Sequence, residues 1–362
     1  MRIIVKEAVP VPVYKQIKEE IKNYLIENKV REGTPLPDIK TIASIAGVSL
    51  KTAERALNEL IKENICFRRP KKGTFVGKIN YTILKKKICG VYHARGLKSF
   101  EKDLVQSAIY RGISEQSQKE GIDLFFITTE AEESISFYLR NSELDFKGII
   151  MLHWEDLSEG KILAKKFPYI KIVFLNYYLD GFEDTPSNIY GVFNDDYAGA
   201  YQMTEYLIEK GHKKIAIFTI ELRNENYRQR VEGYKHALED NGIKFERDFV
   251  YIMERREGVD LREVGRSLAR SLINKGTKVS AIFCVNDVMA TGVIDYLREI
   301  GKGEIKVVGY DDIIPHLSRD YKFSTVKVDF EKMGKKAISI LTDKDNKYPK
   351  ILKIPPKLLI RN

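Results

Sequence analysis

Basic side chains are concentrated at the start of this 362-residue chain. Residues 1–78 contain 16 Lys and Arg against 9 Asp and Glu, and three further lysines follow at residues 85–87. Residues 88–362 contain 42 Lys and Arg and 42 Asp and Glu, so the formal net charge of +10 lies in the first quarter of the sequence. Such a basic region is the electrostatic footprint of a nucleic-acid contact. A lysine-rich solvated surface, the alternative, would spread the excess more evenly.

Motifs that would indicate catalysis or a bound metal are absent from the sequence. It has no GxxxxGK[ST], GxGxxG, GxSxG or HExxH pattern, and its five histidines show no ligand spacing. Its three cysteines, Cys66, Cys89 and Cys284, form no CxxC pair, which is typical of a reducing cytoplasm. We therefore expect a binding protein without catalytic residues, metal or cofactor.

The sequence also gives no sign of a membrane segment. The first 20 residues lack the apolar run and small-residue cleavage site of a signal peptide. No stretch approaches the roughly 18 apolar residues that are needed to cross a bilayer. We therefore expect a cytoplasmic protein.

Two short helices separated by a tight turn are predicted within the basic region. Asp38 can cap a helix over residues 39–46, Gly47 can end it, and Ser49 can cap a second helix over residues 50–63. This helix-turn-helix spacing is the geometry that puts the exposed first turn of the second helix into the major groove of DNA.

The flanking residues complete a winged variant of this motif. Apolar residues at helical spacing predict an amphipathic helix over residues 13–28. Residues 65–69 and 74–76 are expected to form two strands. The turn between them, Pro70-Lys71-Lys72-Gly73, is then a basic wing tip.

This segment resembles the GntR-type winged helix-turn-helix. The matching residues are Leu36-Pro37, Ala43, Gly47-Val48-Ser49, Thr52, Arg55-Ala56-Leu57 and Arg69-Pro70 with Gly73-Thr74-Phe75-Val76. The resemblance covers nearly all of residues 11–77 and implies double-stranded operator DNA as a partner.

The resemblance also implies which positions face DNA: Lys40, Ser49, Leu50, Lys51, Thr52, Arg55 and Gly73. The family usually has arginine where Lys40 and Leu50 stand. Lys40 can bind a phosphate but cannot make the bidentate contact that arginine makes. Leu50 can contact a thymine methyl but cannot hydrogen-bond a guanine. Lys51, Thr52 and Arg55 are the preferred groove contacts, and Lys71 and Lys72 are the preferred wing contacts.

From Ile88 onward, short apolar runs alternate with longer amphipathic stretches. The expected strands include residues 88–92, 124–127, 148–152, 172–175, 215–218, 281–284 and 307–310, and the expected helices include 103–120, 196–210, 228–241, 258–275 and 287–300. Strand–helix alternation predicts parallel sheets that are covered on both faces. Nine or ten such units are too many for one small sheet, so we expect two lobes, with ligands outside the carboxyl ends of the strands.

This body is similar to the LacI/GalR-type effector domain, which shares the two-lobed fold of periplasmic sugar-binding proteins. The residues that carry the similarity are 195–200, 207–216, Arg230 with Gly233-Tyr234, 281–292, 307–312 and 324–327. The pairing of such a body with a GntR-type head is similar to the arabinose-repressor subgroup.

Polar side chains suited to a sugar occur at the positions that this resemblance assigns to the cleft. A sugar hydroxyl both donates and accepts hydrogen bonds; Arg supplies donors, Asp supplies acceptors, and Asn supplies both. The resemblance places Arg230, Asn286 and Asp311 there as effector ligands. The structural alternative is that Asp311 caps a turn and Asn286 a helix. Asp195 and Asp196 are expected to cap the helix that follows them.

Four further residues are candidates for the same site. Asn176 ends a predicted strand where the family usually has Asp. His93 and Arg95 follow the first predicted strand, and Trp154 follows the third, so each can line the near lobe. Packing in the core is the alternative for Trp154.

The expected architecture is therefore α/β, with an N-terminal winged helix-turn-helix domain (residues 1–78), a linker (79–87) and a two-lobed periplasmic-binding-protein-like domain with parallel sheets for effector binding and dimerisation (88–362). The predicted function is a sequence-specific repressor, active as a homodimer and released from its operator by a small sugar, arabinose or another pentose or hexose. The alternatives are a sugar-binding sensor module without direct DNA regulation and a nucleotide-using α/β enzyme.

Overall fold

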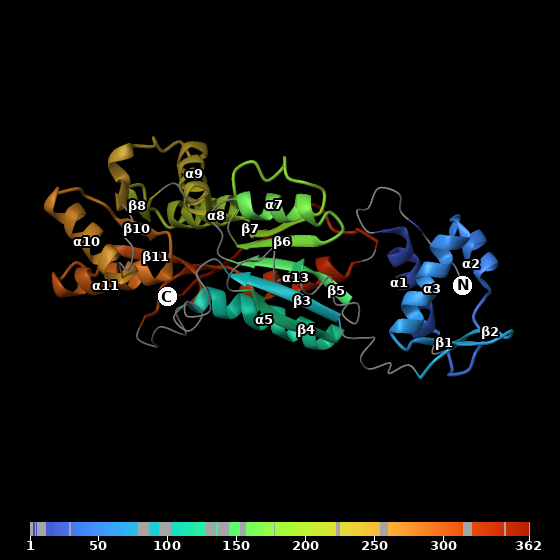
Figure 1. Ribbon diagram of the computed structural model, residues 1–362. Helices are drawn as coiled ribbons and strands as arrows, with labels where there is room; N and C mark the ends of the chain where they lie inside the picture. The colour runs from blue at the N-terminus through green and yellow to red at the C-terminus, as the bar shows by residue number, and fades with distance from the viewer. Residues whose placement is uncertain are drawn as a thin grey trace.

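The computed structural model describes residues 3, 5, 12–28, 30–78, 87–93, 103–127, 135–136, 145–152, 157–176, 178–221, 225–253, 260–313, 321–343 and 345–361. Within them, a small domain of three helices and a two-stranded sheet precedes a larger α/β body of two lobes (Figure 1). No helix in these segments is long and apolar enough to cross a membrane.

The small domain, which we call the head, consists of α1 (Val13–Glu27), α2 (Ile39–Ala46), α3 (Leu50–Lys62), β1 (Cys66–Arg69) and β2 (Gly73–Val76). Apolar side chains from all three helices form its core, and Ile17, Ile21, Ile42, Leu57 and Leu60 are fully buried. The helical stripe predicted for residues 13–28 therefore faces the interior, where burial of apolar surface stabilises the packing of α1 on α3.

Side chains cap both helices of the helix-turn-helix, as the sequence predicts. Asp38 Oδ1 accepts a hydrogen bond from Thr41 N at 2.7 Å, and Ser49 Oγ accepts one from Thr52 N at 3.2 Å. Between the two helices, Gly47 adopts a left-handed conformation with φ of 64° and ends α2. Local sequence thus determines where each helix starts and where α2 stops.

The first lobe contains a six-stranded sheet with strand order β13-β7-β6-β5-β3-β4, and all its pairs are parallel. Its strands are β3 (Lys87–His93), β4 (Ile122–Ile127), β5 (Asp145–Leu152), β6 (Lys171–Asn176), β7 (Ile189–Asn194) and β13 (Ile351–Ile354). Helix α7 (Ser158–Lys166) covers one face, and α5 (Leu104–Glu120) and α13 (Phe330–Thr342) cover the other (Figure 1).

The second lobe has a sheet of strand order β14-β12-β11-β10-β8-β9, in which only the β12–β14 pair is antiparallel. Its strands are β8 (Ile215–Ile220), β9 (Val250–Met253), β10 (Ala281–Cys284), β11 (Lys306–Asp311), β12 (Thr325–Lys327) and β14 (Lys357–Leu359). Helix α8 (Asp196–Glu209) packs on α9 (Glu225–Asp240), and α10 (Leu261–Asn274) packs on α11 (Asp287–Glu299); a short 3-10 helix, η2 (Arg247–Phe249), precedes β9.

The chain passes between the lobes three times. It crosses from β7 to α8, returns from β12 to α13, and crosses again between β13 and β14. Each crossing leaves the carboxyl end of a strand. Since the carboxyl ends of parallel strands share one edge of a sheet, the lobes are joined at the edge where ligands of such sheets bind.

The strands of the first lobe are buried on both faces. In β5, Ile149 and Met151 belong to the apolar cluster beneath α7, whereas Ile150 and Leu152 belong to the cluster beneath α5 and α13. The period-2 alternation of side chains therefore sends apolar groups to both sides. This is why the expected strands appear in the sequence as continuous apolar runs.

Glycines allow two pairs of helices to touch through their backbones. A Cβ on Gly112 of α5 would lie 1.9 Å from the carbonyl oxygen of Glu331 on α13, and one on Gly334 would lie 2.2 Å from that of Ile109. In the second lobe, a Cβ on Gly292 would lie 1.9 Å from Arg262 O. Such distances leave no room for a side chain, so the backbones would have to separate.

We expect Gly112→Ala to destabilise the protein by about 1–3 kcal/mol, because the added methyl pushes α13 away from α5. Thermal unfolding of the full chain measures the effect. Gly303→Ala is the matched control, since a Cβ there meets nothing within 4 Å. Equal melting temperatures for the two variants would contradict the close helix contact.

Candidate DNA-binding face and effector site

The first turn of α3 presents most of the predicted groove contacts to solvent. Ser49, Leu50 and Lys51 are exposed, and Lys40 is exposed on α2. Thr52 is half-buried, and its hydroxyl lies 2.8 Å from that of Ser49. The two hydroxyls therefore hydrogen-bond each other within the cap, whereas Lys51 makes no such contact among the described residues.

Arg55 lies one turn further along α3 and is also exposed. Its guanidinium carbon sits 3.9 Å from the centre of the Tyr14 ring on α1. The spacing of three and four residues from Thr52 and Lys51 puts Arg55 on the same face of the helix. The sequence singled out Arg55 but not its aromatic neighbour.

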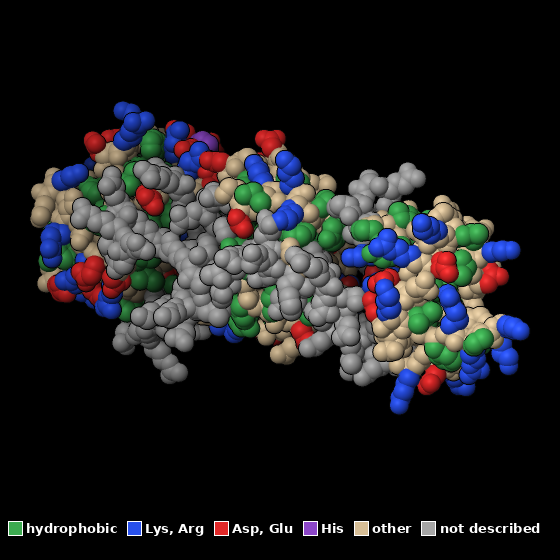
Figure 2. Space-filling model, viewed as in Figure 1, with side chains coloured by type: hydrophobic (Ala, Val, Ile, Leu, Met, Phe, Trp, Pro, Cys, Tyr) green, Lys and Arg blue, Asp and Glu red, His purple; other side chains and the backbone are tan. Residues whose placement is uncertain are grey.

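The wing is the β1–β2 hairpin, whose tip carries Lys71 with φ of 60° and Gly73 with φ of 103°. Lys71 and Lys72 are both exposed. Lys and Arg side chains gather at this outer end of the head (Figure 2). A basic tip that projects from the body has the charge and reach to contact phosphates.

Two wing arginines add to this surface, although the sequence analysis did not select them. Arg68 Nη2 donates to Asn58 Oδ1 of α3 at 3.3 Å, which ties the wing to the helix. Arg69 lies over the stacked rings of Phe67 and Phe75, 5.2 and 5.0 Å from their centres. Their position at the end of a predicted strand, next to the basic turn, could have marked them.

In the body, Arg230 lies on α9 and is buried, and its guanidinium binds groups from three segments. Its Nε donates to Asp196 Oδ1 at 2.8 Å, its Nη2 donates to Asp311 Oδ1 at 3.4 Å, and its Nη1 donates to the carbonyl oxygen of Val285. The guanidinium carbon also stacks 3.7 Å above the ring centre of Tyr310. We call these five residues the arginine site.

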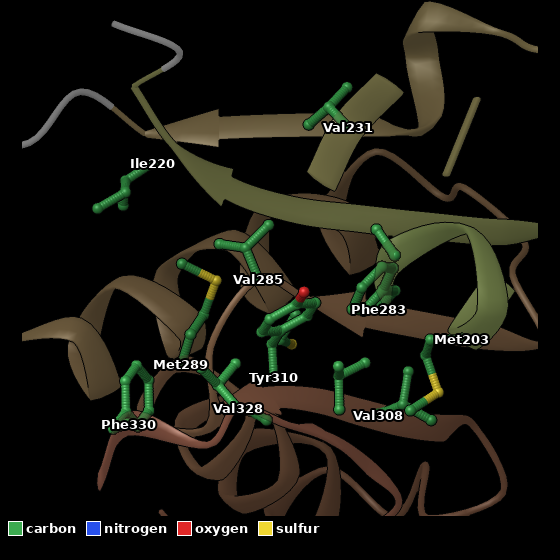
Figure 3. Packing of buried hydrophobic residues seen from close by; sticks show 14 of the residues in the cluster. Met203, Ile220, Val231, Phe283, Val285, Met289, Val308, Tyr310, Val328 and Phe330 are labelled. Carbon is green, nitrogen blue, oxygen red and sulfur yellow. The ribbon is translucent and has the colours of Figure 1, made fainter. Parts of the chain in front are cut away.

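Tyr310 anchors the arginine site in the core of the second lobe. Its ring lies among apolar side chains that include Val285, Met289 and Phe283 (Figure 3). Its hydroxyl accepts a hydrogen bond at 2.9 Å from Asn194 Nδ2, at the end of β7 in the first lobe. Tyr310 and Asn194, neither of which was predicted, therefore link the two lobes at the arginine site.

Asp196 corrects one sequence prediction. Asp195, not Asp196, caps α8, by accepting a hydrogen bond from Ala198 N at 3.2 Å. Asp196 is turned inward, where its Oδ1 accepts from Asn194 at 3.0 Å and from Arg230. Consecutive acidic residues at a helix start hide this division of roles, because either could serve as the cap.

Asp311 ends β11 in a left-handed conformation, with φ of 102°. Burial raises the pKa of its carboxyl group to about 6; Arg230 opposes the rise, and the carboxylates of Asp196 and Asp103 add to it. Asp103 caps α5 in the first lobe. A positive φ in a non-glycine residue at a strand end is typical of a functional position.

Asn286 caps the helix that follows it, which is one of the two roles that the sequence left open. Its Oδ1 accepts a hydrogen bond from Met289 N at 2.8 Å and caps α11. Its Nδ2 is buried and has no hydrogen-bond partner within the described parts of the chain. An unpaired buried donor is costly, so this nitrogen is a candidate for binding a ligand.

Asn176 ends β6 of the first lobe, also with a positive φ, of 73°. Its carbonyl oxygen accepts from Asn226 Nδ2 of α9 at 2.8 Å, and Asn226 Oδ1 accepts from Tyr178 N at 3.2 Å. Next to them, Arg228 pairs with Asp180 at 2.9 Å. The start of α9 thus bridges the lobes through residues that the sequence analysis did not select.

The remaining predicted ligands cannot be placed. His93 ends β3, but its side chain lies outside the described residues, as do Arg95 and Trp154. Among the residues that are described, Asn176 and Asp311 end strands β6 and β11, Asn286 caps α11, and Arg230 lies in the second turn of α9. No group of metal-ligating side chains occurs in this described set.

Comparison with known proteins assigns both parts of the chain. Residues 13–76 match the family of bacterial regulatory proteins called gntR, and residues 204–362 match the periplasmic binding protein-like domain. The chain is 26% identical over 343 residues to the HTH-type transcriptional repressor PurR of Pasteurella multocida, covering 89% of this chain and 97% of that protein. A PurR of Histophilus somni is 31% identical over 198 residues, or 50% of this chain and 57% of its own length.

Solved structures share the fold of the body. A putative LacI regulator from Bacillus cereus subsp. cytotoxis has a TM-score of 0.61 at 24% identity, over 76% of this chain and 98% of its own. The transcriptional regulator CelR in complex with cellobiose has a TM-score of 0.61 at 19% identity, over 90% of this chain and 99% of its own.

Together these findings define the class: the chain is a transcriptional regulator with separate DNA-binding and effector domains, and not an enzyme. Its head is a gntR-family winged helix-turn-helix, and its body is a periplasmic-binding-protein-like domain similar to those of LacI-type regulators.

We expect Arg230→Met to lower the free energy of unfolding by about 3–5 kcal/mol, because it leaves Asp196 and Asp311 buried without their shared cation. Urea denaturation of the full chain measures it. The control is Arg228→Met, which removes a half-exposed guanidinium and should cost under about 1 kcal/mol. Similar costs for both variants would show that Arg230 is not held as described.

Proposed function

We propose that this protein is a repressor that binds operator DNA through α3 and the wing and releases it when a small sugar binds at the junction of the lobes. The observation that carries the proposal is that Arg230 binds both the carboxylate of Asp311 and the carbonyl oxygen of Val285, the residue before Asn286. The amide nitrogen of Asn286 is itself buried and has no partner among the described residues, and the head of the chain is of the gntR type. The head supplies the DNA contact, and the site supplies the response.

The proposed DNA contacts lie on two exposed surfaces of the head. They are Lys40 on α2, Ser49, Lys51, Thr52 and Arg55 around the first turns of α3, and Lys71, Lys72 and Gly73 in the wing. Phosphate contacts would come mainly from the lysines, and base contacts from Arg55 and its neighbours. The uneven charge of the sequence supports this assignment.

The proposed effector is a neutral polyhydroxyl compound, arabinose or another pentose or hexose. Asn286 offers an amide donor that has no partner in the described part of the chain, and Asp311 offers carboxylate oxygens as acceptors for sugar hydroxyls. Asn176, His93, Arg95 and Trp154 are proposed to complete the site. Related structures support a sugar, since CelR holds cellobiose and a LacI-family regulator of Enterococcus faecium holds ribose.

Arg230 would serve the site in a particular way. Three of its five N–H groups are already used by Asp196, Val285 and Asp311. The guanidinium therefore orients the carboxylate of Asp311 and keeps its remaining donors for the ligand. Its buried charge needs these partners. A substitution of Arg230 is therefore expected to destabilise the fold as well as to affect ligand binding.

Release requires that the sugar favour one arrangement of the lobes over another. A hundredfold loss of DNA affinity corresponds to a coupling of about 2.7 kcal/mol, within the usual allosteric range. Only a ligand with different affinities for the two arrangements can supply it. Helix α9 suits this role, since Asn226 contacts the first lobe and Arg230 lies one turn away in the ligand site.

We further propose a homodimer that acts in the cytoplasm, with the head at residues 1–78, a linker at 79–87 and the effector and dimerisation domain at 88–362. A lac repressor of the same fold is a dimer on operator DNA, with a TM-score of 0.59. A two-fold dimer reads a near-palindromic operator, because each head reads one half-site.

We expect Lys71→Ala to weaken binding to operator and scrambled DNA by the same factor and to reduce the slope of log K against log salt by about 1. The reason is that a wing lysine contacts phosphate and reads no base. Fluorescence anisotropy on DNA from the gene's own upstream region measures both. Lys62→Ala, which removes the same charge at the far end of α3, is the control and should leave the slope unchanged.

We expect Asn286→Ser to retain folding and DNA binding but to weaken sugar-induced release at least about tenfold. Serine can still cap α11, but it lacks the Nδ2 donor. The measurement titrates pentoses, hexoses and short oligosaccharides into the preformed DNA complex and follows anisotropy. A normal response of this variant would remove Asn286 from the site. Sugar binding without any binding of upstream DNA would instead favour a sensor module.

A further inference from the structure

We propose that Tyr14 is a positioning residue for DNA recognition: its ring holds the guanidinium of Arg55 in the orientation in which it meets a base. The inference rests on the proposed function of α3 as the DNA-reading helix. It concerns a residue of α1, which the sequence analysis did not connect with DNA.

The contact is close and joins two helices. The guanidinium carbon of Arg55 lies 3.9 Å from the Tyr14 ring centre, which is a stacking distance. Tyr14 occupies the second position of α1 and is half-buried, whereas Arg55 is exposed. Apolar packing of α1 on α3, through residues such as Ile17 and Leu57, fixes the ring relative to the recognition helix.

The hydrogen-bonding groups of Arg55 stay available in this arrangement. Within the described residues, Arg55 makes no hydrogen bond or ion pair, although acidic residues such as Glu54 and Glu59 lie nearby on the same helix. Stacking engages the flat face of a guanidinium and leaves its N–H edge free. A fork held in this way can bind the O6 and N7 atoms of a guanine bidentately.

The energetic benefit comes from ordering the side chain before DNA arrives. An arginine loses rotamer freedom when it is immobilised in an interface. Tyr14 restricts this freedom in the free protein, so less is lost on binding. An exposed cation–π contact is of a size that corresponds to about a two- to fivefold change in affinity.

The wing shows the same arrangement on a smaller scale. Arg69 stacks near the rings of Phe67 and Phe75, whereas Arg68 is held through its N–H groups by Asn58. Arg55 and Arg69 thus both lie near aromatic rings, and both are exposed to solvent.

A double-mutant cycle tests the proposal in the full-length protein. The variants are Tyr14→Leu, Arg55→Ala and the double variant, with Tyr14→Phe to retain the ring. Anisotropy measures their affinities for the upstream operator fragment and for a scrambled duplex at fixed salt. Tyr24→Leu, which removes another half-buried tyrosine of α1, controls for loss of helix packing.

We expect Tyr14→Leu to weaken operator binding about two- to fivefold and to leave the affinity for scrambled DNA unchanged. Tyr14→Phe should bind normally, and Tyr14→Leu should have no further effect once Arg55 is alanine. Tyr24→Leu should match the wild type on both duplexes.

Four results would overturn the proposal. If Tyr14→Leu lowers operator affinity by the same factor in the wild type and in Arg55→Ala, the ring only packs the helices. If Tyr14→Leu binds the operator more tightly, stacking withholds Arg55 from DNA. If Arg55→Ala keeps full operator affinity while Lys71→Ala loses affinity as expected, only this inference is contradicted. A wild-type protein that binds no upstream DNA would sink the proposed function as well.

Discussion

The buried guanidinium of Arg230 is the interaction on which the arrangement of the body depends. A charge removed from water is tolerated only with well-placed partners, and here Asp196, Asp311 and the carbonyl oxygen of Val285 supply them while Tyr310 covers its face. These partners come from the first crossing between the lobes, the end of β10 and the end of β11. Satisfying one side chain therefore fixes the positions of three segments that meet at the proposed ligand site.

Helix α9 carries this site and the contact between the lobes together. Asn226 and Arg230 are four residues apart and so lie on one face of the helix. The first binds the backbone of Asn176 in the first lobe, and the second holds the carboxylates of the second lobe. A ligand that changes the surroundings of Arg230 would act on the same rigid element that spans the lobes, which gives a physical route from site to lobe arrangement.

The head differs from the body because its proposed functional side chains must remain exposed to water. Its core cluster is apolar, the buried lysines Lys18 and Lys22 pair with Glu63, and side chains cap α2 and α3, so the proposed DNA contacts of α3 and the wing can stay on the surface. Where order is needed at the surface, aromatic rings provide it through stacking, as for Arg55 on Tyr14 and Arg69 on Phe67. Stacking constrains a guanidinium without using its hydrogen bonds.

The sequence by itself determined the winged head, the two-lobed α/β body and the absence of catalytic motifs, because caps, helical stripes and apolar runs are local features. Residues 39–46 and 281–284 were predicted at their observed bounds for this reason. Strands such as β9, short and with Ile252 half-exposed, give no comparable signal. Only the tertiary structure decided that Asp196 turns inward, that Asn226 bridges the lobes and that Tyr14 lies under Arg55. These roles depend on segments that are distant in sequence and are set by packing, which no local pattern records.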